Sequence, residues 1–232
     1  MNFKKYYEDN KTYIVHTDKR LDKITSLTES INPKAILDIG CGSGYLLDLL
    51  AKSLPSSSLS GVDVYANSST KKGWKYKKAD ITDGLPFANS EFDCIILGEV
   101  IEHVPNPDFL LREIRRVLKK KGKLIISTPN LVSWANRVMV LFGVQPFFTE
   151  TSSEVNLGRF FPFLGQGGKV QGHLKVFTYK SLEEILEKEK FIIVNKMGVP
   201  FFFPFPISIV DRLFSHILPF TSGLLYVAER SK

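Results

Sequence analysis

Three glycines at alternate positions, Gly40, Gly42 and Gly44, directly follow a short apolar run at residues 35–40. Such a run is typical of a buried parallel strand. Glycine permits positive φ and lets the backbone approach a ligand closely. A turn of this kind, at the carboxyl edge of an open parallel sheet, is where such folds bind nucleotides. Tyr45 follows Gly44, so the spacing departs from the dinucleotide-binding glycine pattern.

Strand-like and helix-like segments alternate along the chain around this turn. The pattern predicts strands at residues 35–40, 59–64, 74–80, 92–98 and 123–128, and helices at 45–52 and 108–121. Further helices are predicted at 131–142 and 181–190, with Thr178 or Ser181 as the N-cap of the second, and further strands at 191–197 and 224–229. The proline spacing at 199–206 excludes a central strand or helix there. This alternation predicts a doubly wound α/β sheet with right-handed crossovers.

Composition limits the classes of protein that this chain can represent. Its 232 residues, 44% apolar and 24% charged, fit one globular domain. No uncharged apolar run reaches the roughly 18 residues that span a bilayer, and residues 1–9 lack the apolar core of a signal peptide. Two cysteines, Cys41 and Cys94, cannot make a disulfide framework. We therefore expect a cytoplasmic protein.

Two acidic residues close the strands that follow the glycine turn. Asp63 ends the second predicted strand, about 20 residues after the turn, where a carboxylate can accept hydrogen bonds from two ribose hydroxyls. Asp80 ends the third, where a carboxylate can accept from an adenine amino group. Each aspartate alone is more typical of a cap or turn. A glycine turn and two acids in order at three strand ends favour nucleotide binding.

These motifs make residues 35–130 resemble class I S-adenosylmethionine-dependent methyltransferases. Residues 37–44 match the family's first motif, 61–63 its second-strand acid, and 99–105 are similar to its fourth-strand region. The resemblance implies a mostly parallel, seven-stranded Rossmann-like sheet whose last strand is antiparallel. It also implies S-adenosylmethionine as cofactor, bound by Asp38, Gly40, Cys41, Gly42, Gly44, Asp63, Val64, Asp80, Ile81 and Glu99.

The same resemblance divides the chain into functional segments. Residues 1–30 are expected to form an N-terminal helical cap, and 35–130 the cofactor-binding half. Residues 131–175 and 199–222 are expected to form lid insertions over the acceptor. Residues 85–194 are also similar to methyltransferase-like proteins of methionine biosynthesis and of surface-polysaccharide clusters, which decides no substrate.

Acidic and imidazole groups gather just beyond the fourth predicted strand. If a helical turn begins there, Glu99 shares a face with Glu102 or His103. His103, with Glu102, is our expected catalytic base. A divalent metal held by Glu99, Glu102, His103 and His173 is an alternative that we do not favour. That layout resembles the ubiquinone-biosynthesis O-methyltransferases and the small-RNA terminal 2'-O-methyltransferases.

Phenylalanine concentrates in the two expected lid segments. Twelve of the 18 phenylalanines fall at 142–163 and 199–220. Apolar walls are the usual surroundings of a bound ligand, and we expect O-methylation of a small apolar or lipid-linked acceptor. Apolar side chains beside Lys and Arg, in a chain of net charge +7, leave a peripheral membrane contact open.

Two other functions remain open at this point. The charge fits an RNA 2'-O-methyltransferase, but the basic clusters carry no aromatic-interleaved RNA-reading motif, so we expect no nucleic-acid partner. A non-catalytic S-adenosylmethionine-binding protein would need the same glycine turn and Asp63. The sequence does not give the oligomeric state.

Overall fold

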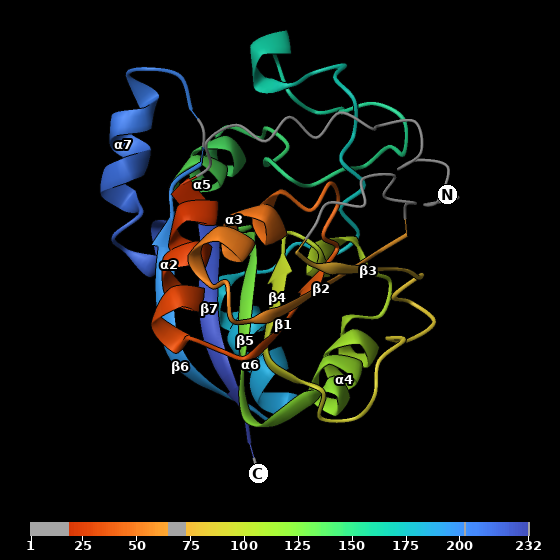
Figure 1. Cartoon of the computed structure of the whole chain (residues 1–232). Helices are drawn as coiled ribbons and strands as arrows, with labels where there is room; N and C mark the ends of the chain where they lie inside the picture. The colour runs from red at the N-terminus through yellow and green to blue at the C-terminus, as the bar shows by residue number, and fades with distance from the viewer. Residues whose placement is uncertain (1–18, 65–72, 202, 232) are drawn as a thin grey trace.

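The computed structural model describes residues 19–64, 73–201 and 203–231. Its centre is a seven-stranded sheet in the order β3-β2-β1-β4-β5-β7-β6 (Figure 1). The strands are β1 (Ala35–Ile39), β2 (Ser58–Asp63), β3 (Lys75–Lys78), β4 (Phe92–Gly98), β5 (Leu118–Pro129), β6 (Phe191–Val199) and β7 (Gly223–Arg230). Strands β1 to β5 are parallel, and β7 is antiparallel to both β5 and β6. The expected doubly wound sheet with an antiparallel last strand is therefore confirmed.

Helices cover both faces of this sheet because its buried strands alternate apolar side chains between two cores. On one face, α2 (Lys19–Ile31) and α3 (Tyr45–Ser53) pack through Ile24 and Leu47 into a core that contains Ile36 of β1. On the other, α4 (Pro107–Val117) and α6 (Tyr179–Lys188) enclose a core that contains Leu37, the next residue of β1. The sheet is thus buried on both sides, as a parallel sheet requires.

The boundary between α4 and β5 differs from the sequence-based prediction. The helix predicted over residues 108–121 ends at Val117, and Leu118 opens β5, opposite Phe92 of β4. The N–H groups of Ser90 and Glu91 donate to the carbonyls of Arg116 and Val117. Because this neighbouring segment satisfies the last helix carbonyls, and because the basic run at 119–121 adds no apolar residue to the helix stripe, the chain turns into the sheet.

The other predicted boundaries agree more closely with the structure, although one helix was not predicted. Thr178 caps α6 in a capping box with Ser181, as predicted. Helix α5 (Trp134–Leu141) begins after its N-cap Ser133, three residues later than predicted. The sequence analysis did not predict α7 (Ile207–Phe214), which begins directly after the proline-rich run. Within the expected cap, α2 is described from Lys19 onwards; residues 1–18 lie outside the described chain.

Short segments complete the end of the molecule at which the parallel strands terminate. These are the 3₁₀ helices η1 (Ile101–His103), η2 (Pro162–Leu164) and η3 (Leu218–Phe220). Helices α5 and α7 and the chain around η2 lie beyond the carboxyl ends of the parallel strands (Figure 1). Across the described residues, no helix has the length and apolar character needed to cross a bilayer. Cys41 and Cys94 are both buried free thiols.

Candidate functional site

The glycine turn after β1 is built so that side chains are excluded from it. Gly40, Gly42 and Gly44 have φ of 73°, 51° and 78°. A Cβ at Gly40 would lie 2.4 Å from Val100, and one at Gly44 would lie 2.2 Å from the ring of Trp74. Among the described residues, a Cβ at Gly42 would meet nothing within 4 Å. Glycine at this position is therefore explained by its positive φ, which L side chains rarely adopt.

Asp63 ties this turn to the end of β2. It is 9% exposed, and its Oδ2 accepts a hydrogen bond from the N–H of Gly42 at 2.8 Å. Val64 follows it directly, and the chain from 65 to 72 lies outside the described residues. The structure thus brings two predicted cofactor residues, Gly42 and Asp63, into contact.

Asp80 was predicted to close the third strand, but β3 ends at Lys78, so Asp80 and Ile81 lie just beyond its end. The carboxylate of Asp80 is exposed and accepts from both the N–H and the hydroxyl of Thr82. Ile81 is half-buried and packs against the core. Asp80 therefore caps a local turn just beyond the strand end in this structure.

Two groups beneath the turn, Asp38 and Cys41, are buried. The pKa of Asp38 is raised to about 8. Burial is the main cause and the negative charge of Asp63 the second, while Arg20 acts in the opposite direction. Burial also raises the pKa of the Cys41 thiol, which excludes a reactive thiolate. A largely neutral buried carboxyl beside a second acid is suited to receive a cationic ligand group, which would restore its charge.

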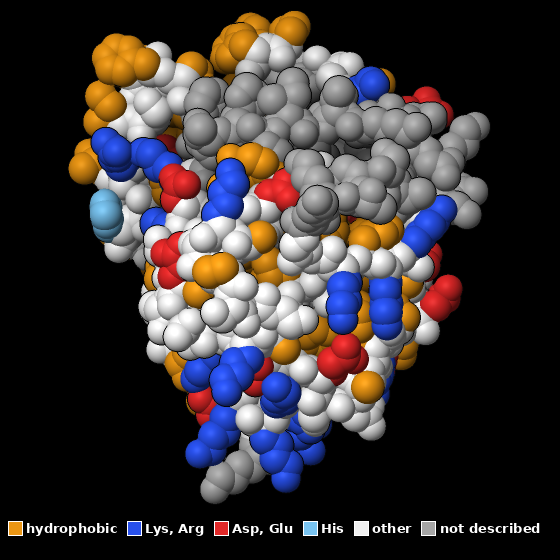
Figure 2. All heavy atoms as spheres, in the orientation of Figure 1, with side chains coloured by type: hydrophobic (Ala, Val, Ile, Leu, Met, Phe, Trp, Pro, Cys, Tyr) orange, Lys and Arg blue, Asp and Glu red, His pale blue; other side chains and the backbone are white. Residues whose placement is uncertain are grey.

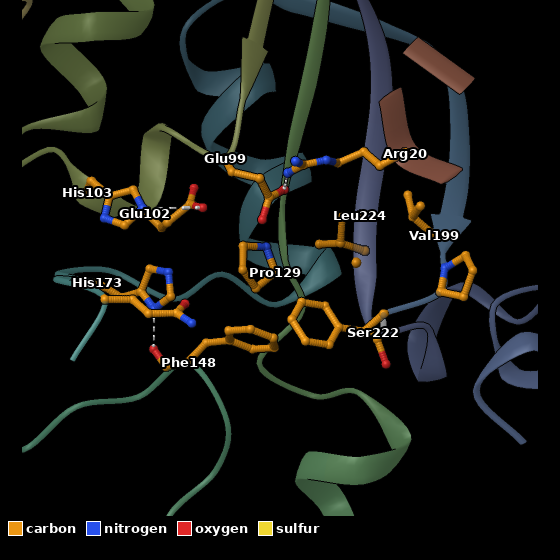
Figure 3. Close-up of a pocket in the computed structure, with 14 residues that line it drawn as sticks. Arg20, Glu99, Glu102, His103, Pro129, Phe148, His173, Val199, Ser222 and Leu224 are labelled. Carbon is orange, nitrogen blue, oxygen red and sulfur yellow. Dashed lines mark hydrogen bonds and ion pairs between the residues drawn. The ribbon is translucent and has the colours of Figure 1, made fainter. Parts of the chain in front are cut away.

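Arg20 is a site residue that the sequence analysis missed. It reaches from α2 to Glu99, with 2.9 Å between its guanidinium nitrogen and Glu99 Oε1 (Figure 3). Glu99 follows β4 with φ of 54°, and its Oε1 also accepts from the hydroxyl of Ser127 at 2.9 Å. No motif separates Arg20 from the other basic residues of its segment, so only the packing of α2 reveals its role.

Glu102 lies in η1, and its side chain is completely buried. Its Oε2 accepts from the hydroxyl of Thr128 at 3.0 Å, whereas among the described residues Oε1 has no hydrogen-bond partner. Burial raises the pKa of Glu102 to about 7 against the opposing effect of these hydrogen bonds. Glu99 precedes the 3₁₀ turn and bonds to Arg20, so the expectation that Glu99 and Glu102 share a helical face is wrong.

The rings of His103 and His173 lie beside Glu102, tilted by 34° to each other, with centroids 4.7 Å apart. Nδ1 of His103 lies 3.2 Å from the carbonyl oxygen of Gly172, and Nδ1 of His173 lies 3.0 Å from that of Phe148. Because a carbonyl can only accept, both Nδ1 atoms carry the proton and both Nε2 atoms carry a lone pair. Burial lowers the pKa of His173 to about 4, and burial together with the neighbouring His173 lowers the pKa of His103 to about 4.

Three of the four candidate metal ligands come together in this arrangement. Glu102, His103 and His173 each offer one ligand atom, and these atoms all lie within 4.8 Å of one another. Two imidazole nitrogens and the carboxylate of Glu102, whose Oε1 has no hydrogen-bond partner among the described residues, form a donor set suited to a divalent cation. Glu99 does not belong to this group.

A cavity of about 220 Å³ joins these polar groups to an apolar wall (Figure 3). Arg20, Glu99, Glu102, His103 and His173 line one side. The opposite side is formed mainly by apolar side chains: Phe148, Val199, Pro200, Phe201 and Leu224. Of these, Phe148 and Phe201 come from the two segments expected to form a lid, and their rings contact each other with centroids 4.9 Å apart. The cavity can hold a small ligand with one polar and one apolar end.

Comparisons with known proteins agree with this geometry. A protein family described as "Methyltransferase domain" matches residues 13–195. A ubiquinone biosynthesis O-methyltransferase from Glaesserella parasuis is 30% identical over 135 residues, which cover 53% of this chain and 56% of that protein. A demethylmenaquinone methyltransferase from Thermotoga maritima is 30% identical over 113 residues, which cover 45% and 47%. This chain spans about half the length of the curated relatives it matches.

Similarity to solved structures extends over the whole fold. A Burkholderia thailandensis 1,6-didemethyltoxoflavin-N1-methyltransferase, solved with its substrate and S-adenosylhomocysteine, superimposes with a TM-score of 0.62. The match covers 100% of this chain and 86% of that one at 14% sequence identity. At this identity, the likeness establishes the fold alone.

Proposed function

This chain belongs to the methyltransferase-domain family, and from that premise we propose that it transfers a methyl group from S-adenosylmethionine to an oxygen atom of a small apolar or lipid-linked acceptor. The observation that carries the proposal is the cavity beside the strand ends. It combines a neutral imidazole, a buried carboxyl group and an aromatic wall. Relatives named as quinone-biosynthesis methyltransferases support an apolar acceptor.

The residues around the glycine turn are suited to hold this cofactor. The glycine turn around Gly42 and the carboxylate of Asp63 are proposed to bind its nucleoside part. Asp38, whose burial keeps its pKa near 8, and Glu99 are proposed to bind its cationic amino-acid end, with Arg20 beside the carboxylate of that end. When bound, S-adenosylmethionine supplies a methyl carbon already activated by a sulfonium, so the protein has mainly to align the acceptor.

His103 is proposed to remove the proton of the acceptor hydroxyl. Its Nε2 carries a lone pair because Nδ1 donates to Gly172, and its lowered pKa keeps the ring neutral at pH 7. Transfer of the methyl group from the bound cofactor to the acceptor oxygen would release the hydroxyl proton, and Nε2 of His103 would accept it. Glu102 Oε1, 3.9 Å from Nε2, then offsets the positive charge of the imidazolium.

Glu102, His103 and His173 also fit a divalent cation, which would lower the pKa of an acceptor hydroxyl. A histidine base and a metal site predict different responses of turnover to chelation. Turnover that survives exhaustive dialysis against EDTA supports His103 as the base. Turnover that is lost, and is restored by one divalent cation, assigns the cluster to a metal.

The test is transfer of radiolabelled methyl from S-adenosylmethionine into a cell extract, followed by partition into organic, small polar and nucleic-acid fractions. Label in the organic fraction that depends on active protein supports the proposal. Label in the nucleic-acid fraction supports the RNA 2'-O-methyltransferase alternative. Cofactor binding without label in any fraction, across a panel of extracts, supports a non-catalytic binding protein.

Two histidine variants locate the base. His103→Gln is expected to lower kcat by about 10²–10⁴-fold with cofactor affinity nearly unchanged. His216→Gln, at an exposed position, is the matched control and is expected to leave both unchanged. Equal loss of turnover and cofactor affinity in His103→Gln would make His103 a structural residue.

A further inference from the structure

Helix α7 turns its apolar side towards solvent. Among its described residues, Ile207, Ile209, Val210 and Leu213 are 43%, 51%, 39% and 67% exposed. The one residue of the helix that is fully buried is its acid, Asp211. A helix on the surface of a soluble domain normally has the opposite arrangement, with apolar residues inward.

Hydrogen bonds to Asp211 fix this orientation. Its carboxylate accepts from the indole N–H of Trp134 at 2.8 Å, from the hydroxyl of Ser222 and from the N–H of Phe201. Rotating the helix to bury its apolar side would pull the carboxylate away from three donors, one of which, the hydroxyl of Ser222, belongs to a buried residue. The outward apolar side is therefore a stable property of the fold.

A second exposed apolar group lies on the chain around η2. Phe160, Phe161 and Phe163 are 64%, 51% and 80% exposed, and Phe205, just before α7, is 80% exposed. Hydrophobic side chains gather over α7 and over the η2 segment, and both groups project from the same end of the molecule (Figure 2). We call these six residues the apolar face: Phe160, Phe161, Phe163, Phe205, Ile209 and Leu213. Exposed apolar surface of this kind marks an interaction site.

The two segments that carry the apolar face expose mainly positive charges. Within the described parts of segments 131–175 and 199–222, the exposed basic residues are Arg137, Lys169, Lys175 and Arg212, against a single exposed acid, Glu154. Figure 2 shows basic side chains next to the hydrophobic group over α7. Apolar residues flanked by Lys and Arg complement the acyl boundary and the anionic headgroups of a lipid bilayer.

We propose that the apolar face docks this protein on the surface of an anionic lipid bilayer. Ile209, Leu213 and the three η2 phenylalanines enter the headgroup–acyl boundary, and the basic residues contact the lipid headgroups. The face continues into the candidate site, because Phe201 lines the cavity and is itself 44% exposed. Delivery of an apolar acceptor along this route rests on the proposed function; the docking itself does not.

Vesicle flotation tests the docking without any need for activity. The whole chain is mixed with vesicles of phosphatidylcholine alone or of equal parts phosphatidylcholine and phosphatidylglycerol. We expect binding to the anionic vesicles that weakens with added salt and is much lower on phosphatidylcholine alone. The double variant Leu213→Ser/Phe163→Ser is expected to lower the vesicle affinity by roughly tenfold or more.

The matched control is Ile192→Ser, because Ile192 is 55% exposed but belongs to the start of β6, at the other end of the sheet. It should bind vesicles like the unmodified chain. Failure of the unmodified chain to bind anionic vesicles overturns the proposal, as does an equal loss in Ile192→Ser. Sedimentation equilibrium tests the other possible occupant of the apolar face, a second copy of this chain. A dimer that Leu213→Ser dissociates, together with absent vesicle binding, would assign the face to that second copy. Methyl transfer that persists in a non-binding variant would separate failure of docking from failure of the proposed function.

Discussion

Helix α4, in the segment expected to bind the cofactor, and helix α7, in a segment expected to form a lid, are both amphipathic, but they face opposite ways. Helix α4 buries Leu110, Leu111 and Ile114 in the core and exposes or half-exposes its charges. Helix α7 buries Asp211 and exposes Leu213. In α4 the packing of apolar groups holds the helix, whereas in α7 the hydrogen bonds of one buried acid do so together with the ring of Phe214, which stacks on Trp134. An amphipathic pattern thus predicts a helix without predicting which side faces the protein.

The largest expected contrast between the two helices concerns their leucines. Leu111→Ala should lower the free energy of unfolding by about 2–5 kcal/mol, because it leaves a cavity in the core. Leu213→Ala should change it by less than about 0.5 kcal/mol, because that side chain is mostly in solvent. Urea unfolding followed by circular dichroism measures both. Similar losses in the two variants would mean that α7 also packs through its leucine.

Substitution of the acids of the two helices should have effects on stability in the reverse order, with the larger loss in α7. Asp211→Ala leaves the donors on Trp134, Ser222 and Phe201 without their acceptor and should destabilise the fold by about 2–3 kcal/mol. Asp108→Ala removes an exposed pair with Lys188 and should cost under about 1 kcal/mol. The same urea titration compares them. A negligible effect of Asp211→Ala would contradict its role as the anchor of α7.

The next comparison concerns Asp63, an acid that is proposed to bind the cofactor. Asp63→Ala should weaken S-adenosylmethionine binding by about 1.5–3 kcal/mol through loss of a charged hydrogen-bond acceptor. Asp83→Ala, at an exposed position of the same half, should leave affinity unchanged. Isothermal titration calorimetry gives both affinities. An unchanged affinity in Asp63→Ala would remove Asp63 from the cofactor site.

The last expected effect is a slope, the pH dependence of stability, rather than a loss at one pH. His103 has a pKa near 4 when folded and near 6.5 when unfolded, so the unfolded chain binds more protons between these values. Its contribution to stability is complete above pH 6.5 and is lost as the pH falls towards 4. His103→Gln should therefore flatten the fall in stability by up to about 1.4 kcal/mol per pH unit within this window.

This effect is measured with chelated, cofactor-free protein by urea titrations at several pH values. His216→Gln is the exposed control and should retain the slope of the unmodified chain. Parallel curves for His103→Gln and the unmodified chain would contradict the burial of a neutral imidazole.

The cofactor half was more predictable from sequence than the lid because its constraints are local. The run before Gly40 and the acid at Asp63 each follow from one strand and its end, and β4 was predicted with its observed bounds. Arg20 and the separation of Glu99 from Glu102 depend on how α2 and η1 pack against β5, which no short motif encodes. Helix α7 was missed because its stabilising contacts come from Trp134 and Ser222, distant in sequence.

The position of β7 between β5 and β6 has a consequence for the order of assembly. Strand β6 has no pairing with β5 and joins the sheet through β7, which is synthesised after it. Until β7 leaves the ribosome, the unpaired edge of β5 stays open to pairing with other chains. Completion of the sheet therefore depends on one late, long-range strand, and nascent chains that lack it would be the species most in need of chaperones.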